Sequence, residues 1–198
     1  MKFFSVAYNA LIASWAGLLN RHEIAAEYWL RVAELQPRDA KAFASAAHHK
    51  AAGTSTLEAI ALLRKAVDVD PKFVAAWFNL GFLLQKQDEH LQALDAFDKA
   101  ILQDEKLDRG HYGRALSLIA LNRHEEAKAA LNRTIDLQPM SPYGYYQLAA
   151  LHHRLGDEKA CVKLVRQLSS FEPALAVQLQ KETGVKAGVV DPMDYYRS

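Results

Sequence analysis

Residues 74–107 read VAAWFNLGFLLQKQDEHLQALDAFDKAILQDEKL. The first half of this segment carries an apolar stripe at i, i+3, i+4 and i+7, formed by Trp77, Leu80, Gly81 and Leu84. A polar stretch follows and predicts a turn, after which Ala93, Phe97 and Ala100 recur at helical spacing. The segment therefore predicts two helices joined by a short turn.

The same pattern returns every 34 residues along the chain. Proline stands at positions 37, 71, 139 and 173, and Glu105 takes the missing place. Two ladders hold small residues: Ala25, Ala59, Ala93, Ala127 and Cys161 form one, and Ala13, Ala47, Gly81, Ala115 and Ala149 form the other. A further ladder is large and apolar: Trp29, Leu63, Phe97, Leu131 and Val165. Ladders that share one period without an insertion predict an array of stacked helix pairs.

These positions resemble the tetratricopeptide repeat, a pattern of two helices in 34 residues with aromatic, small and proline positions in this order. The resemblance predicts five repeats, at 6–39, 40–73, 74–107, 108–141 and 142–175. It implies an all-α fold, a right-handed superhelical solenoid of antiparallel helix pairs. The residues that depart from the pattern are His111 and Arg114 in the fourth repeat, Lys50 in the second, and Asn9 and Ala16 in the first.

Composition limits the classes of function. The 198 residues include 24 Lys and Arg against 23 Asp and Glu, a net charge of +1, which argues against a dedicated nucleic-acid binder. Many Ala and Leu residues and few β-branched residues favour helices over a sheet. The single cysteine, Cys161, excludes an intrachain disulfide framework and a cysteine-rich zinc site.

The two ends of the chain need separate interpretation. The uncharged run 3–19 follows Lys2, and one interpretation of it is a signal peptide. The run is short for a membrane span. The repeat register instead predicts a first helix over about 7–18, which favours an uncleaved, cytoplasmic protein. Residues 1–175 then hold the repeats. Pro173 and Gly184 predict the start and the stop of a C-terminal capping helix, so residues 176–198 comprise the rest of that helix and a flexible tail.

Catalysis finds little support in the residues. His22, His90 and His124 recur at one repeat position, so we expect solvated side chains at successive helix starts rather than a convergent site. The pairs 48–49 and 152–153 are adjacent histidines, which point apart on a helix and chelate a metal poorly. Cys161 stands at a small buried position of the repeat, which indicates a core thiol. We therefore predict no enzyme activity, no metal and no cofactor.

The resemblance implies that the first helix of each repeat lines a concave groove. The groove positions carry five aromatic residues and four cations, with no Asp or Glu. Such a groove suits a protein or peptide segment with hydrophobic anchors and acidic character, so we predict a non-enzymatic scaffold or adaptor. The candidate partner-binding residues are Lys41, His48, Phe78, Asn79, Phe82, Lys86, Arg109, Tyr112, Tyr143, Tyr146, His153 and Arg154.

The same residues bear on three other kinds of partner. Aromatic and basic residues together also suit single-stranded RNA. The tail residues Asp191, Asp194, Tyr195 and Tyr196 are acidic and aromatic, so the tail could dock in a groove and produce autoinhibition or a homo-oligomer. A clamp for the C-terminal carboxylate of a chaperone is disfavoured: Asn79 and Arg109 match it, whereas Ala44, His48 and Gly113 do not. We expect a protein or peptide partner rather than a nucleic acid or a membrane.

Overall fold

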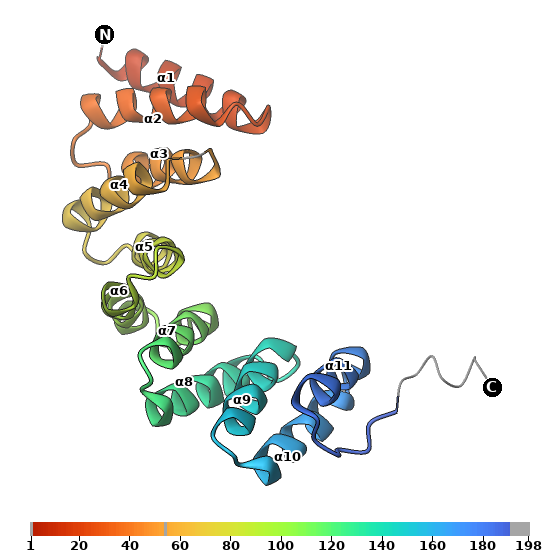
Figure 1. Ribbon diagram of the computed structural model, residues 1–198. Coiled ribbons are helices and arrows are strands. Elements are labelled where there is room, and N and C mark those ends of the chain that lie inside the picture. The colour runs from red at the N-terminus through yellow and green to blue at the C-terminus, as the bar shows by residue number, and fades with distance from the viewer. Residues whose placement is uncertain (1, 54, 191–198) are drawn as a thin grey trace. The chain divides into compact units, whose positions relative to one another are not determined.

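The computed structural model describes residues 2–53 and 55–190, with side chains from residue 4 onward, and is helical throughout its regular elements (Figure 1). Its helices are α1 (Lys2–Leu18), α2 (His22–Leu35), α3 (Ala40–Ala52), α4 (Thr56–Val69), α5 (Val74–Lys86), α6 (His90–Gln103), α7 (Asp108–Ala120), α8 (His124–Leu137), α9 (Pro142–Arg154), α10 (Glu158–Ser169) and α11 (Pro173–Thr183). The described residues form no strand. The predicted all-α fold of helix pairs is confirmed.

The chain divides into two compact units, residues 1–105 (unit 1) and residues 106–198 (unit 2). In unit 1 each of the helices α1 to α5 packs against the next one along the chain, up to α6. In unit 2 the helices α7 to α10 pack in the same sequential way, and α11 lies against both α10 and α9. Sequential packing of this kind is what an array of helix pairs requires, because each pair buries its apolar face on its neighbour.

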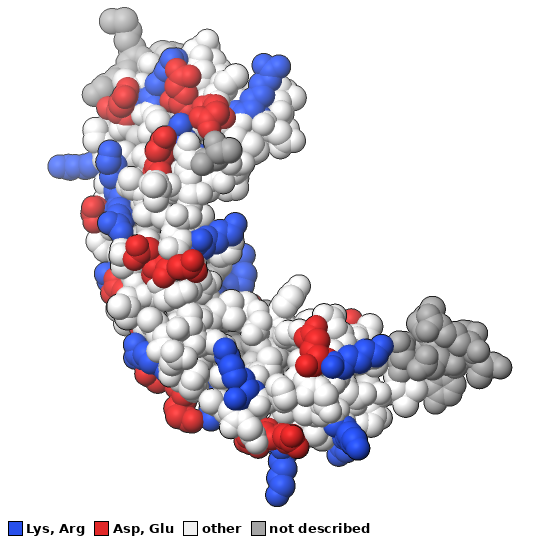
Figure 2. All heavy atoms as spheres, viewed as in Figure 1, with Lys and Arg blue, Asp and Glu red and all other residues white. Residues whose placement is uncertain are grey.

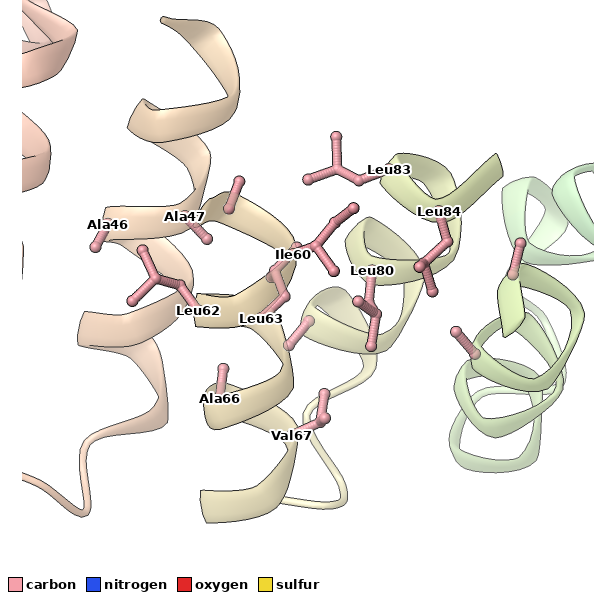
Figure 3. Close-up of a cluster of buried hydrophobic side chains, with 14 of the residues drawn as sticks. Ala46, Ala47, Ile60, Leu62, Leu63, Ala66, Val67, Leu80, Leu83 and Leu84 are labelled. Carbon is pink, nitrogen blue, oxygen red and sulfur yellow. The ribbon is translucent and has the colours of Figure 1, made fainter. Parts of the chain in front are cut away.

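The core of unit 1 is built from small residues on one helix and larger ones on the next. Side chains of α3, α4 and α5 turn inward between these helices (Figure 3). Phe97 of α6 is buried and lies over Gly81 of α5, where an added Cβ would stand 2.9 Å from the ring. The absence of a side chain at Gly81 therefore leaves the space that the Phe97 ring fills.

The turns inside the helix pairs follow the same period. Asn20, Asp88, Asn122 and Gly156 have positive φ angles of 55°, 59°, 57° and 78°. These four positions are 34 or 68 residues apart, in the turn between the two helices of a pair. Asn, Asp and Gly are the residues that adopt this left-handed region most readily. The turn inside a helix pair therefore uses the same left-handed backbone conformation in both units.

The helix at one end of the chain differs from expectation, and the helix at the other end agrees with it. Helix α1 begins at Lys2, earlier than the predicted start near residue 7. Helix α11 spans Pro173–Thr183 and stops at Gly184 with φ 71°, so the predicted capping helix is confirmed. None of the helices described between residues 2 and 190 is both long and apolar enough to cross a membrane.

The segment after Gly184 was predicted to be a flexible tail, but its first residues are held in place. Val185 and Ala187 are buried. The guanidinium of Arg166 in α10 donates a hydrogen bond to the carbonyl of Ala187, with Nε–O 2.9 Å. The amide of Gln180 in α11 bonds the backbone of Ala187 and Val189. The acidic and aromatic residues of the proposed docking tail lie beyond residue 190, outside the described residues.

Candidate functional site

Unit 1 presents the first group of candidate residues on α3 and α5. We call Lys41, His48, Phe78, Asn79, Phe82 and Lys86 the unit 1 surface. All of them are exposed except Phe78, which is half-buried. The ring of Phe78 lies 6.0 Å from that of Phe97, so Phe78 contributes mainly to the core of its own helix pair.

A pocket opens at the centre of the unit 1 surface. Its volume is about 140 Å³. Three predicted residues line it, His48 from α3 and Asn79 and Phe82 from α5, together with Ala47, Ala51, Leu63 and Leu83. The floor is therefore apolar, while an imidazole and an amide stand at the rim. An apolar cavity of roughly 150 Å³ can hold a benzene-sized group, so this pocket has the size of one hydrophobic side chain.

A cation stands beside the pocket. The Nζ atom of Lys86 lies 4.9 Å from the centre of the Phe82 ring, within the range of a cation–π contact. Phe82 nevertheless remains 43% exposed. The pair thus offers an accessible aromatic face and a positive charge at one place, one turn apart on α5.

Unit 2 presents the second group of candidates on α7 and α9. We call Arg109, Tyr112, Tyr143, Tyr146, His153 and Arg154 the unit 2 surface. The rings of Tyr112 and Tyr143 are 6.2 Å apart and tilted by 59°. Burial raises the pKa of Tyr112 above its usual value, and a hydrogen bond with Gln147 acts in the opposite direction. Tyr143 is 65% exposed, so the pair presents one anchored ring and one accessible ring.

Tyr146 has a partner that the sequence analysis missed. Its hydroxyl donates a hydrogen bond to the carboxylate of Glu182 in α11, and this carboxylate also accepts one from Gln178 at 2.8 Å. The hydrogen bond to Glu182 raises the pKa of Tyr146 and lowers that of Glu182. The groove positions lie on first helices only, so the repeat pattern does not indicate a carboxylate contributed by the capping helix. Glu182 places a negative charge beside a set of residues predicted to have none.

The remaining candidates in unit 2 are basic. Arg109 and Arg154 are exposed, while His153 is half-buried with its Nδ1 shielded from solvent and no hydrogen-bond partner among the described residues. On the face of the molecule that Figure 2 shows, blue and red groups alternate over the described surface. That face carries no continuous basic field of the kind that nucleic-acid binding uses.

The repeated histidines require a correction. His22, His90 and His124 do begin α2, α6 and α8. They are half-buried rather than solvated, and the Nδ1 atoms of His90 and His124 lack a hydrogen-bond partner among the described residues. His22 approaches His49 of α3, with 3.2 Å between the two Nδ1 atoms. For His22 the neighbouring helix α3 therefore forms part of the environment.

Metal and thiol chemistry gain no support from the geometry. In residues 2–53 and 55–190, no group of three or more His, Cys, Asp or Glu side chains is placed to hold a metal ion. Cys161 is fully buried in α10, as predicted for a core thiol. Burial raises its pKa, which keeps the thiol protonated and a poor nucleophile.

Family patterns match the chain in both units. Residues 57–88 match a family described as TPR repeat, and residues 74–107 and 112–160 match families described as tetratricopeptide repeat. Together these matches cover about half of the chain.

Two curated relatives share part of the sequence. Human protein O-mannosyl-transferase TMTC3 is 29% identical over 145 residues, which are 70% of this chain and 15% of that protein. The Hsp70-Hsp90 organizing protein of Triticum aestivum is 32% identical over 78 residues, 39% of this chain and 12% of that protein. The chain thus spans less than a sixth of the length of either relative.

Solved structures match over most of the chain. A crystal structure of MamA superposes with a TM-score of 0.79 at 18% identity and covers 95% of this chain and 98% of that one. YrrB, described as a TPR protein with an unusual peptide-binding site, superposes with a TM-score of 0.75 at 18% identity and covers 85% and 88%. At these identities the likeness shows the shared fold.

Proposed function

The chain belongs to the tetratricopeptide-repeat family, and from this premise we propose that it is a non-enzymatic scaffold that binds a segment of another protein. The segment would carry hydrophobic anchors and acidic residues. YrrB has the same fold and is described as having a peptide-binding site, which supports a peptide ligand as the first hypothesis. The first helices of the repeats would provide the contacts, on the unit 1 surface and the unit 2 surface.

The observation that carries the proposal is the pocket of the unit 1 surface. His48, Asn79 and Phe82 were proposed from repeat positions alone, and all three line the same cavity of about 140 Å³. Its apolar floor would take one aliphatic or aromatic side chain of the ligand. The Asn79 amide can both donate to and accept from a peptide backbone. A buried anchor with polar groups around it is the arrangement of an interface hot spot.

Acidic character in the ligand is supported by the cations near the aromatic rings. Lys86 stands over Phe82 in unit 1, and Arg109 and Arg154 are exposed on the unit 2 surface. Charges at the rim of an interface mainly raise the rate of association and select among partners. The negative charge of Glu182 would repel acidic ligand residues near Tyr146. We therefore expect acidic residues of the ligand to contact mainly the unit 1 surface.

The test is a binding experiment with paired variants. Immobilised wild-type chain, Phe82→Ala and the control Leu91→Ala are exposed to a native lysate and to an array of peptides that combine acidic and hydrophobic residues. Leu91 is 68% exposed on α6 of the same unit and does not line the pocket at Phe82. Loss of an anchor contact costs about 1–2 kcal/mol, or about 5- to 30-fold in affinity.

We expect peptide capture to fall in Phe82→Ala and to persist in Leu91→Ala. Equal capture by both variants would contradict the proposal. Capture of RNA that disappears steeply with added salt and ignores sequence would instead favour the nucleic-acid alternative.

Two further features belong to the same proposal. We place the scaffold in the cytoplasm, because α1 packs on α2 as part of the first helix pair and its cleavage would remove half of that pair. Fractionation of cells that express the tagged chain tests this placement. A homo-oligomer formed through the tail stays an alternative; deletion of residues 185–198 should then raise partner affinity or abolish self-association.

A further inference from the structure

Helix α1 exposes a row of large apolar side chains. Tyr8, Leu11, Trp15 and Leu18 are 61%, 58%, 60% and 77% exposed. Their spacing of three, four and three residues places them along one line of the helix, with the 3.5-residue period of a seam that packs against a second helix. We call these four residues the α1 stripe. The opposite side of α1 is buried on α2 through Ala13 and Ala16.

The equivalent positions on the first helices of later repeats show what usually packs against this side of α1. The residues 34, 68 and 136 positions after Tyr8 are Ala42, Ala76 and Gly144, and all three are buried. Ala42 packs in one cluster with Val32 and Ala33 of the preceding helix α2. A Cβ at Gly144 would lie 2.8 Å from Ile135 of the preceding helix α8. Three residues equivalent to Trp15, namely Leu83, Ser117 and Leu151, are buried as well. Tyr8 and Trp15 therefore occupy the side on which a preceding helix packs elsewhere in the chain. Leu11 and Leu18 lie at the edge of that side, in register with the exposed residues Asn79, Lys86 and Arg154.

The residue types at these positions decide what could cover the stripe. Ala42, Ala76 and Gly144 are small, so the preceding helix approaches closely. Tyr8 replaces this small residue with a phenol ring that stands in the way of such an approach. A further repeat stacked in the regular manner would clash with it or leave it unburied. The occupant of the α1 stripe is consequently something other than one more repeat of the same kind.

We propose that the α1 stripe is the interface between two copies of this chain, paired symmetrically through their α1 helices. Residues 3–19 contain no charged side chain, so two copies can meet there without repulsion between like charges. An aromatic side chain presents about 150–250 Å² in total, so the stripe offers on the order of 500 Å² per copy. The pair then buries about 1,000 Å², which reaches the lower limit of a specific protein interface.

A lipid surface fits the stripe less well. Helices that lie on membranes carry Lys and Arg beside their apolar side, where these contact the head groups. Residues 3–19 carry neither, and the side of α1 opposite the stripe is packed on α2. Self-pairing requires only a second copy of the same uncharged surface. A two-fold pair also closes on itself, so it yields a dimer rather than a filament.

The test is sedimentation of the full chain over a wide range of concentration, with variants inside and outside the stripe. Wild type should double its mass as concentration rises. Leu11→Glu should remain a monomer, because two carboxylates would meet near the centre of the pair. The matched control Leu57→Glu changes a leucine that is 73% exposed on α4, and it should still form the dimer. Circular dichroism checks that each variant keeps its helices.

A second variant makes the test specific for symmetric pairing. Leu11→Lys should also be monomeric alone, but an equimolar mixture with Leu11→Glu should restore the doubled mass. A monomeric wild type at every concentration, or a dimer that persists in Leu11→Glu, would overturn the proposal. Wild type that stays monomeric and floats with vesicles of phosphatidylcholine and phosphatidylserine would overturn it in favour of a lipid surface.

Discussion

The first helix of unit 1 and the last helix of unit 2 present opposite kinds of outer surface. Helix α11 buries Ala176, Val177 and Leu179 and leaves polar side chains outside, among them Gln178 and Glu182. Helix α1 buries small residues toward α2 and leaves the α1 stripe outside. Arrays of helical repeats need a polar outer surface at their terminal units to remain soluble. The outer side of α11 is polar in this way, whereas the outer side of α1 is apolar.

Tryptophan allows the two units to be observed separately. All three tryptophans, Trp15, Trp29 and Trp77, lie in unit 1. Their fluorescence therefore reports the unfolding of unit 1, while hydrogen exchange of assigned amides reports each unit. Each of the following changes acts on one unit and leaves the other as its reference.

The largest effect is expected from Phe97→Ala in unit 1. Phe97 is 1% exposed and fills the space over Gly81. Removing a buried phenyl ring leaves a cavity and costs about 3–5 kcal/mol of unfolding free energy. Urea denaturation followed by tryptophan fluorescence measures the loss. The control Leu91→Ala, on the exposed side of the same helix, should stay within about 0.5 kcal/mol of wild type. A small loss for Phe97→Ala would contradict the close packing of α5 and α6.

Two glycines test whether both units depend on close helix approach. Gly81→Ala would bring a Cβ to 2.9 Å from the Phe97 ring, and Gly144→Ala would bring one to 2.8 Å from Ile135. Overpacking costs about 1–3 kcal/mol, while the better helix propensity of Ala returns about 1 kcal/mol. We expect a net loss of about 1 kcal/mol at both sites. Gly81→Ala is measured by tryptophan fluorescence and Gly144→Ala by amide exchange; a gain in stability at either site would show that its neighbour moves aside freely.

Repetition explains how much of this structure the sequence predicts. A residue type that recurs every 34 residues indicates the environment of its position several times over, so the sequence alone assigns Phe97 and Cys161 to the core. The capping helix was equally readable from Pro173 and Gly184, since each acts locally on the backbone.

Features that occur once were missed. The bond between Tyr146 and Glu182 joins residues 36 positions apart on helices of different types, and no period predicts it. The anchoring of residues 185–190 depends on the side chains of Arg166 and Gln180, which reach a segment without secondary structure. The candidate site itself was predicted as a set of positions. Its pocket required the rotamers of His48, Asn79 and Phe82, which a sequence pattern does not fix.

At the end of unit 2 the expected effect is confined to one short segment and does not reach the packing of the helix pairs. The Gln180 amide accepts hydrogen bonds from the backbone N–H groups of Ala187 and Val189, both at 3.1 Å, and donates one to the Val189 carbonyl at 3.0 Å. Gln180→Ala removes all three, each with a net value of about 0.5–1.5 kcal/mol. The loss should appear locally, as faster amide exchange at Ala187 and Val189. The control Gln178→Ala changes a neighbouring glutamine that bonds Glu182 instead, and it should leave these two amides protected.

The smallest effect separates the two units by pH. In unit 1, burial lowers the pKa of His49, and the charges of His48 and His22 lower it further. The unfolded chain therefore binds the proton first. His49 contributes to the stability of unit 1 at pH values above its unfolded pKa of about 6.5. This contribution is lost as the pH falls through the lower pKa that His49 has in the folded state. In unit 2 the pKa of Tyr112 is raised by burial and that of Tyr146 by its bond to Glu182.

For the tyrosines the direction is reversed. The folded state retains the tyrosine protons, while the unfolded state loses them above about pH 10. The contribution of the two tyrosines to the stability of unit 2 therefore disappears as the pH rises through their folded-state pKa values. Unit 1 should therefore weaken in mild acid and unit 2 in alkali. Tryptophan-detected urea midpoints between mild acid and neutral pH measure the first effect, and His49→Gln should flatten that dependence because glutamine does not titrate. An unchanged slope in His49→Gln would assign the acid sensitivity of unit 1 to groups other than His49.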